Sequence, residues 1–279
     1  MFTPSNRIRR VSRIVGQMDH SEYEYLSLDL RSNGVLAVTF DNPDKLNAVT
    51  ERGHYELVRI WPDVDADPDV RVVLLRGEGR AFSAGGDYQM IDNILSDQAT
   101  HRRVLKETRE LVRNIIECSK PIVSAINGVA VGAGLAAALM ADIPVASRSA
   151  RILDGHTTIG VTAGDHAAVI WPLLVGMAKS KYHLLTNRPI DGETAERIGL
   201  VAEVVDDEEL VAFTETLADE LATGAQESIQ WTKHTLNHWL RMAYPIFDAS
   251  VAYEFLGFHG SDVVEGIAAS REKRRPVFE

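Results

Sequence analysis

The stretch PIVSAINGVAVGAGLAAALMAD, residues 121–142, joins two apolar runs through a turn of small residues. The first run, Ile122 to Ile126, predicts a buried strand, and Asn127-Gly128 ends it. Gly132-Ala133-Gly134 then opens a segment rich in alanine and leucine, which predicts a buried helix ending near Asp142. Small residues let another molecule approach the backbone, and the first N–H groups of a helix lack intrahelical partners. This turn is therefore suited to holding an oxygen anion.

A second turn of small residues follows another strand-like run. Residues 70–75 (VRVVLL) are mostly aliphatic, and RAFSAGGD, residues 80–87, comes shortly after them. Tight packing alone explains many turns of this kind. Two such turns lying together can each direct one backbone N–H at the same carbonyl oxygen. Each donor of that type is typically worth ~3–4 kcal/mol of transition-state stabilisation.

Four motifs occur in an order that resembles the crotonase superfamily, also called the enoyl-CoA hydratase/isomerase family. They are KLNAV (45–49), AFSAGGD (81–87), KPIVSAINGVAVGAG (120–134) and REKRRPVF (271–278), and the likeness runs from about Tyr25 to the C-terminus. The resemblance implies an α/β fold, a crotonase-like spiral of ββα turns with a helical C-terminal region used for trimerisation. We therefore expect a homotrimer or a dimer of trimers.

The pattern of elements agrees with this expectation. Strands alternate with helices as far as about residue 205, and the rest reads as four helices, at about 208–222, 226–242, 246–258 and 262–273. We divide the chain into a flexible N-terminal extension (1–20), a crotonase-like spiral core (21–205) and a C-terminal helical oligomerisation region (206–279).

The N-terminal extension carries an arginine-rich segment, NRIRRVSR, at residues 6–13. Such a start is typical of a mitochondrial transit peptide, but also of a disordered tail or of a chain whose translation starts at Met18. We favour the last two interpretations and expect a cytoplasmic protein.

The composition of the chain excludes several classes of partner and of structure. The chain has 279 residues, a formal net charge of −11 and a single cysteine, Cys118. The acidic balance argues against a nucleic-acid surface, and one cysteine excludes an intrachain disulfide framework. The longest apolar stretch is interrupted by polar residues and glycines, so no membrane span is expected.

The family resemblance assigns roles to particular residues. It places the oxyanion-hole donors at the backbone N–H groups of Gly86 and Ala133, which would hold a thioester carbonyl and the enolate formed next to it. The residues that match the path of the adenine and pantetheine are Lys45, Leu46, Ala48, Ala84 and Asp87, and Lys273 matches a basic residue near the CoA phosphates. Coenzyme A enters as part of the substrate, and no permanently bound cofactor and no metal set are expected.

The sequence departs from the family at the two catalytic positions. Hydratases of this family use two glutamates to add water across a double bond. The first position is Ala136 in this chain, and the second is His156. Because an alanine side chain neither accepts nor donates a proton, the usual two-carboxylate water addition cannot run here in the same way.

Another acid/base group lies in LDGHTTIGVTAGDHAA, residues 153–168. This segment holds Asp154, His156, Asp165 and His166. A histidine can act as a general base near neutral pH, and an aspartate can orient it or act as its acid partner. We therefore predict His156 and Asp165 as the catalytic pair. The alternative for Asp165 is a structural one, the N-cap of the helix that runs to Val175.

The same region, residues 153–186, is similar to oxocamphor hydrolase, a crotonase homologue that cleaves a C–C bond of a cyclic β-diketone. The catalytic His and Asp of that enzyme fall on His156 and Asp165, with the same nine-residue gap. A further histidine of that enzyme has no counterpart in the turn at residues 132–134.

Three functions remain open from the sequence. The favoured one is an acyl-CoA-processing enzyme of the enoyl-CoA hydratase/isomerase family, with a His/Asp pair in place of two glutamates. The second is a hydrolase that cleaves a C–C bond of a β-dicarbonyl compound. The third is a catalytically silent CoA-binding protein, which the missing glutamates permit.

Overall fold

The computed structural model describes residues 17–279, so the arginine-rich part of the predicted N-terminal extension lies outside the described residues. Contacts with the rest of the chain begin before the predicted boundary at residue 20. The Met18 N–H donates to Asp67 Oδ2 at 2.8 Å, and the Gln17 side chain donates to Asp69 at 2.6 Å.

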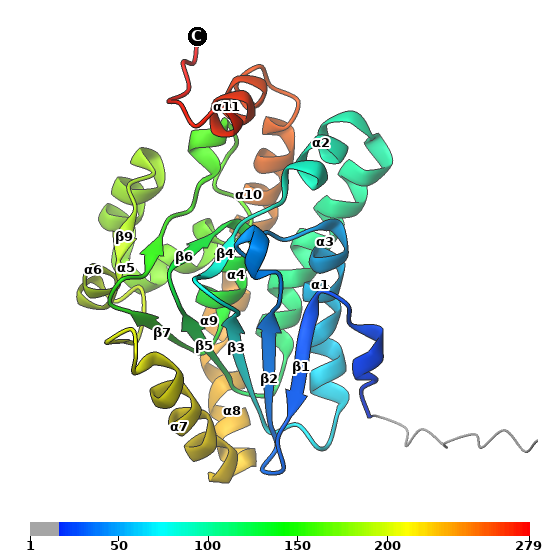
Figure 1. Ribbon diagram of the computed structural model, residues 1–279, viewed down its shortest axis with the longest axis vertical. Helices are drawn as coiled ribbons and strands as arrows, with labels where there is room; N and C mark the ends of the chain where they lie inside the picture. Colours follow the sequence, from blue (N-terminus) through cyan, green and yellow to red (C-terminus); the bar gives the residue numbers. More distant parts are fainter. Residues whose placement is uncertain (1–16) are drawn as a thin grey trace, which may run out of the picture.

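A six-stranded sheet runs through the centre of the molecule in the order β1-β2-β3-β5-β7-β10 (Figure 1). β1 is antiparallel to β2, and all other neighbours are parallel. The strands are β1 (Leu26–Leu30), β2 (Val35–Phe40), β3 (Val72–Gly77), β5 (Ile122–Ile126), β7 (Ile143–Ser147) and β10 (Glu203–Val205).

A smaller sheet of four strands has the order β4-β6-β8-β9, and only its β8–β9 pair is antiparallel. Its strands are β4 (Ala81–Ala84), β6 (Val129–Val131), β8 (Arg151–Ile152) and β9 (Ile190–Asp191). Successive strands alternate between the sheets, as β3 then β4 and β5 then β6, before a helix follows. This alternation is the predicted spiral of ββα turns, so the fold class is confirmed.

The helices surround the sheets. They are α1 (Glu51–Ala66), α2 (Tyr88–Ser96), α3 (Gln98–Glu117), α4 (Gly132–Met140), α5 (Ala167–Thr186), α6 (Gly192–Ile198), α7 (Leu210–Thr223), α8 (Gln226–Leu236), α9 (His238–Met242), α10 (Tyr244–Gly257) and α11 (Asp262–Arg271). Short 3₁₀ turns are η1 (His20–Glu22), η2 (Pro43–Lys45) and η3 (His156–Ile159). The single helix expected over 226–242 is two helices, because the chain turns at Asn237.

The four inner strands of the larger sheet, β2, β3, β5 and β7, are buried on both faces, which explains their nearly continuous apolar sequences. In β3, Val73 and Leu75 join the main core, whereas Val72 and Leu74 face the opposite side and join a second core with α7. Neighbouring residues of a strand point to opposite faces, so one run of valines and leucines serves two layers.

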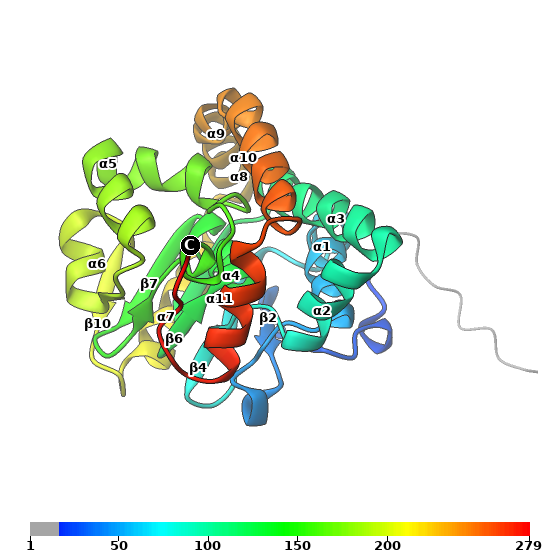
Figure 2. The ribbon, with the colours of Figure 1, turned by 90° about the horizontal axis from the view of Figure 1, so that it is seen from above.

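The C-terminal helices pack on the core and reach the side of the molecule where α2 lies. α10 lies against α3 and α5, and α11 packs against η3 (Figure 2). Tyr88 of α2 hydrogen-bonds Ser270 of α11 at 2.8 Å, and Arg271 pairs with Asp92 at 2.7 Å. None of the helices in residues 17–279 is long and apolar enough to cross a membrane.

Candidate active site

A cavity of about 640 Å³ lies among segments that are far apart in the sequence. The two small-residue turns, the loop before α1, η3 and the helices α2, α3, α10 and α11 all contribute to its walls. One side is apolar, with Met90, Ile94, Leu111, Phe255 and Phe258. Three of its polar lining residues, Asp154, Asp165 and Glu254, lie around His156, so the cavity joins an apolar compartment to a group of titratable side chains.

The two turns are adjacent because the strands before them are paired. Ala84 of β4 is the register partner of Val131 of β6, and Gly86 and Ala133 each follow two residues later. A Cβ built on Gly132 would lie 3.3 Å from Gly85 Cα and 3.8 Å from Gly86 N. The sequence-predicted oxyanion donors therefore belong to neighbouring backbone segments, and both residues line the cavity.

The backbone around Gly86 explains the direction of its N–H. Val49 donates to the Gly85 carbonyl at 2.7 Å, and the Asp87 N–H donates to the Val49 carbonyl at 2.9 Å. In an extended segment, successive N–H groups point to opposite sides, so the Gly86 N–H points away from Val49. That side is the one on which the turn at residues 132–134 lies.

Ala133 lies in the first turn of α4, where N–H groups have no intrahelical acceptor. The N-cap residue, Val131, supplies no side-chain acceptor. Packing also constrains this turn, because a Cβ on Gly134 would lie 2.3 Å from the Ser83 Cβ. The small residues thus allow α4 to approach β4 and leave a backbone N–H available at the same place.

His156 is held by carboxylates on both sides of its ring. Its Nδ1 lies 3.0 Å from Asp154 Oδ1. Its Nε2 faces Asp165 Oδ2 at 3.9 Å and Glu254 Oε1 at 3.7 Å. All four residues are buried and line the cavity. The structure thus brings His156 and Asp165 together, but the hydrogen-bonded partner of His156 is Asp154.

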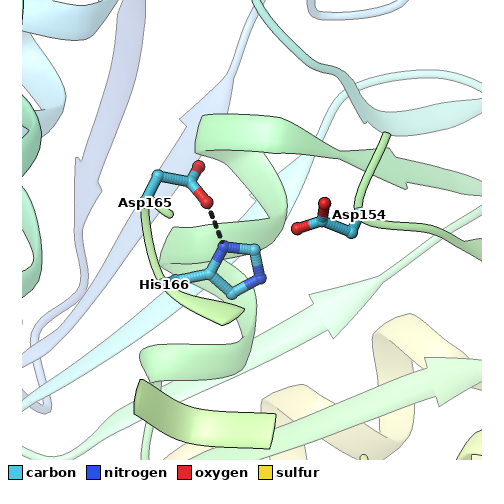
Figure 3. A group of neighbouring side chains, drawn as sticks. All are labelled: Asp154, Asp165 and His166. Carbon is cyan, nitrogen blue, oxygen red and sulfur yellow. Dashed lines mark hydrogen bonds and ion pairs between the residues drawn. The ribbon is translucent and has the colours of Figure 1, made fainter. Parts of the chain in front are cut away.

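Asp165 is positioned by the histidine next to it. Its Oδ1 hydrogen-bonds His166 Nδ1 at 2.6 Å, and Trp171 Nε1–H donates to His166 Nε2 at 3.4 Å. Figure 3 shows His166 between Asp165 and Asp154, with the Asp154 carboxylate turned toward the ring. The N-cap interpretation of Asp165 is wrong, because the N-cap of α5 is the next residue, His166. The His166 side chain makes no capping hydrogen bond. The Asp165 carboxylate instead hydrogen-bonds His166 through Oδ1 and faces His156 through Oδ2.

The charges in this cluster shift its pKa values in opposite directions. Burial alone lowers the pKa of a histidine, but Asp154, Asp165 and Glu254 outweigh burial and hold the pKa of His156 well above its ordinary value. Burial raises the pKa of a carboxyl, but His166 and His156 outweigh it and lower the pKa of Asp165. Burial, with Asp165 and Asp154 nearby, raises the pKa of Glu254 well above its ordinary value, although His156 opposes the shift.

Sequence reasoning missed Glu254, which lies on α10 and comes to the cluster only through tertiary packing. Its Oε2 atom is buried and has no hydrogen-bond partner among the described residues. The local sequence VAYEFLGF, residues 251–258, contained a signal, since it places one acid within an apolar helical run. A buried acid in that setting generally needs a partner or a function.

A second buried pair, His54 and Glu107, was also missed. His54 of α1 lines the cavity, and its Nδ1 lies 2.9 Å from Glu107 Oε2 on α3. Arg103 donates to both Glu107 oxygens, at 2.9 and 3.2 Å. Both residues lie on the buried faces of their helices, and nothing in their spacing distinguishes them from ordinary amphipathic positions.

The residues predicted for the CoA path divide into two groups. Lys45, Ala48, Ala84 and Asp87 line the cavity, whereas Leu46 and Lys273 are not among its lining residues. The Leu46 carbonyl instead accepts the Ala84 N–H at 2.9 Å, which fixes the end of β4. Asp87 also caps α2 by accepting the Met90 N–H at 2.8 Å. Ala136 is buried inside α4 and does not line the cavity.

Comparisons with known proteins agree with this architecture. A 1,2-epoxyphenylacetyl-CoA isomerase from Escherichia coli is 30% identical over 248 residues, which cover 88% of this chain and 95% of that protein. A crystal structure of an enoyl-CoA hydratase/isomerase from Mycobacterium paratuberculosis has a TM-score of 0.84 at 29% identity, and the match covers 88% of this chain and 97% of that one.

A third comparison concerns a different reaction. The structure of a β-diketone hydrolase from the cyanobacterium Anabaena, bound to (S)-3-oxocyclohexyl acetic acid, has a TM-score of 0.81 at 25% identity. The match covers 88% of this chain and 98% of that one. The sequence profile of the family described as enoyl-CoA hydratase/isomerase matches residues 30–279. With the ββα spiral and nearly the whole chain matched, this protein belongs to the enoyl-CoA hydratase/isomerase family.

Proposed function

We propose that this protein is an enzyme that forms an enolate from an acyl-CoA thioester. The thioester carbonyl accepts hydrogen bonds from the Gly86 and Ala133 N–H groups, which strengthen as negative charge develops on that oxygen. Two such donors typically contribute ~3–4 kcal/mol each to the transition state. The paired ends of β4 and β6 support this proposal, because they put both residues at one edge of the cavity.

The proton is moved by His156, Asp165 and Glu254. The pKa shifts favour the protonated forms of His156 and Glu254 and the ionised form of Asp165. Asp165 is then the group that can receive a proton, and His156 and Glu254 are the groups that can donate one. The observation that carries the proposal is this buried cluster of His156, Asp165 and Glu254 at the wall of the cavity, where Ala136 offers no carboxylate. Groups with pKa values driven apart are typical of acid/base catalysis.

The rest of the substrate follows from the lining residues. Coenzyme A is held as part of the substrate along Lys45, Ala48, Ala84 and Asp87, with no permanently bound cofactor. Leu46 shapes this path through its backbone, and Lys273 meets the CoA phosphates from the C-terminal segment. The acyl group enters the apolar compartment between α2, α3 and α10. We also propose a cytoplasmic enzyme.

The same proposal includes a homotrimer or a dimer of trimers built through residues 206–279. Large apolar side chains of this region are more than half exposed: Trp231, Trp239, Met242, Ile246 and Leu256. Large exposed apolar side chains concentrated in one region of the chain favour an interaction surface there. Sedimentation analysis tests this part, and a monomer at micromolar concentration would contradict it.

The first experiment is steady-state turnover of crotonyl-CoA, followed through the loss of the conjugated thioester. We expect turnover in the wild type and its loss in His156→Ala. Protein that binds CoA but leaves crotonyl-CoA, its isomers and other acyl-CoA thioesters unchanged would overturn the proposal. If that protein is equally inactive on β-dicarbonyl compounds, it is a silent CoA-binding protein.

The second candidate is hydrolysis of a C–C bond in a β-dicarbonyl compound. Water attacks one ketone carbonyl, a group of the cluster accepts the water proton, and the C–C bond breaks. The departing carbon becomes an enolate held at Gly86 and Ala133, and a proton from the cluster completes it as a ketone or thioester. Two observations favour this candidate: the missing carboxylate at Ala136, and the β-diketone hydrolase among the structural relatives.

Its test is acid release from cyclic β-diketones and from their CoA thioesters. Turnover of these compounds, with crotonyl-CoA unchanged, would replace the first proposal by the second. Comparing the free diketone with its thioester also decides whether CoA is required.

A further inference from the structure

One buried carboxyl group in the cavity, Glu254, lacks the hydrogen bonds that would compensate its burial. Glu254 is 5% exposed, and its Oε2 has no hydrogen-bond partner among the described residues. Its Oε1 faces His156 Nε2 at 3.7 Å, which is too long for a hydrogen bond. Burying such a group costs free energy unless a proton, a cation or another ligand compensates it.

Three atoms converge on the same point. His156 Nε2, Asp165 Oδ2 and Glu254 Oε1 come from η3, the segment before α5 and α10, and one atom of each lies within 4.8 Å of the others. The two distances from Nε2 are 3.7 and 3.9 Å. Ligands at about 2.0–2.2 Å around a tetrahedral zinc ion lie roughly 3.3–3.6 Å apart. The two distances from His156 Nε2 are thus slightly wider than the spacing of two ligands of one such ion.

The orientation of His156 also fits a ligand. Its Nδ1 is held by Asp154 Oδ1 at 3.0 Å, so Nε2 is the atom presented to Asp165 and Glu254. A histidine that binds a metal through one nitrogen usually donates its other N–H to a carboxylate or carbonyl, which fixes the ring. Asp154 supplies that support. The neighbouring group of Asp154, Asp165 and His166 is less suited, because Trp171 and Asp165 already occupy both nitrogens of His166.

The access to these three residues and the charge around them also favour a bound cation. All three residues line the cavity, which provides an entry path and room for water as a fourth ligand. Asp154, Asp165 and Glu254 together bring three carboxylates around one imidazole, so a divalent cation would balance charge that is otherwise balanced by protons. Metal binding displaces protons from histidine and carboxylate ligands.

We propose that His156, Asp165 and Glu254 form a site for a divalent transition-metal ion of the zinc class. Imidazole and carboxylate ligands suit Zn²⁺ and Co²⁺. A bound ion occupies the atoms that carry the protons, so it inhibits turnover reversibly. The inhibition rests on the proposed function, whereas the binding does not.

The binding test uses full-length protein freed of metal with a chelator and titrated calorimetrically with Zn²⁺ alone. We expect one site per chain in the wild type and at least tenfold weaker binding in Glu254→Gln and in Asp165→Asn. Glu110→Gln, a glutamate on α3 away from the cluster, is the matched control and should bind like the wild type. Circular dichroism of each variant checks that it is folded.

A surface site must be distinguished from the buried one. His234 and His238 have ring centroids 5.2 Å apart and offer such a competitor. Zinc binding that is lost in His238→Gln and retained in Glu254→Gln would overturn the proposal, as would the absence of a site in the wild type. Titration with Co²⁺ adds a spectroscopic signature, since visible d–d bands should appear in the wild type and in His238→Gln but fade in Glu254→Gln.

Measurements of turnover then test the expected inhibition by the bound ion. We expect Zn²⁺ to reduce turnover over the concentration range in which it binds, and a chelator to restore it. Binding without inhibition would leave the metal site in place but contradict the role given to the cluster in catalysis. No binding with normal turnover would overturn the metal site and leave the proposed function intact.

Discussion

Two buried histidines line the same cavity, and each hydrogen-bonds a carboxylate through Nδ1. His54 on α1 meets Glu107 at 2.9 Å, and His156 on η3 meets Asp154 at 3.0 Å. Both side chains are buried. His54 and His156 are thus alike in burial and in the carboxylate that each contacts through Nδ1.

Their further neighbours make them different. Glu107 receives two hydrogen bonds from Arg103, and although burial raises its pKa, His54 and Arg103 outweigh burial and lower it. The pKa of Glu254, beside His156 and without such an arginine, is raised instead. Arg103 therefore favours the ionised form of Glu107, whereas the protonated form of Glu254 is favoured. The pKa of a carboxyl beside a buried histidine thus depends on which other charged residues contact that carboxyl.

The largest expected difference is in catalysis. His156→Asn should lower kcat by about 10²–10⁴-fold, because general acid–base groups typically contribute that much. His54→Asn should lower it far less, since His54 is tied to Glu107. The measurement is kcat/KM of both variants on the substrate identified above, with circular dichroism as the folding control. Equal losses in the two variants would remove the distinction between the histidines.

The second difference is in stability. Glu107→Gln leaves Arg103 and His54 with a neutral partner and should cost about 1–3 kcal/mol of unfolding free energy. Glu254→Gln should cost less than about 1 kcal/mol near neutral pH, because an amide resembles the protonated carboxyl that the raised pKa favours. Urea unfolding at pH 7 measures both. A larger cost for Glu254→Gln would show that its carboxylate is ionised and stabilising.

The pH dependence of stability gives the third test. Since the folded pKa of Glu254 lies above its unfolded value, its contribution to stability is fully present below the unfolded pKa. That contribution is lost as pH rises through the folded pKa, because the buried carboxyl must then ionise. Glu254→Gln has no such ionisation. We expect its melting temperature to fall less than that of the wild type as pH rises from the unfolded pKa of a glutamate toward the raised folded pKa, and parallel curves would contradict this.

The smallest expected effect comes from removing Arg103, the cation that contacts Glu107 in the His54–Glu107 pair. The pKa of Glu107 is lowered, so its contribution is present above the unfolded pKa and is lost as pH falls through the folded one. Arg103→Met should move that loss to higher pH. Because Arg103 is partly exposed, we expect a cost of about 0.5–1 kcal/mol. Acid unfolding midpoints measure it, and Lys106→Met on the same helix is the control.

Much of the fold followed from local sequence. The run Ile122–Ile126 forms β5, and Gly132 opens α4, as the small-residue turn predicted. Gly86 and Ala133 were assigned together by family resemblance, and the pairing of β4 with β6 explains why they are neighbours. These features depend on backbone conformation, and small residues with their spacing encode it directly.

The acid/base group was only partly predictable. Spacing and resemblance identified His156 and Asp165, which lie 3.9 Å apart, but assigned neither Asp154 as the hydrogen-bonded partner nor Glu254 as a member. Glu254 reaches the site through the packing of α10. Asp165 comes just before His166, the N-cap of α5, and its carboxylate hydrogen-bonds His166 and faces His156.

The sequence by itself therefore determined the ββα spiral, the two small-residue turns and the departure from a two-glutamate site at Ala136 and His156. Only the tertiary structure decided which carboxylates surround His156, in which direction their pKa values shift, and that Glu107 with Arg103 is the partner of His54. The physical reason is that charge interactions depend on distance through space and on burial. Neither quantity can be read from separation along the chain.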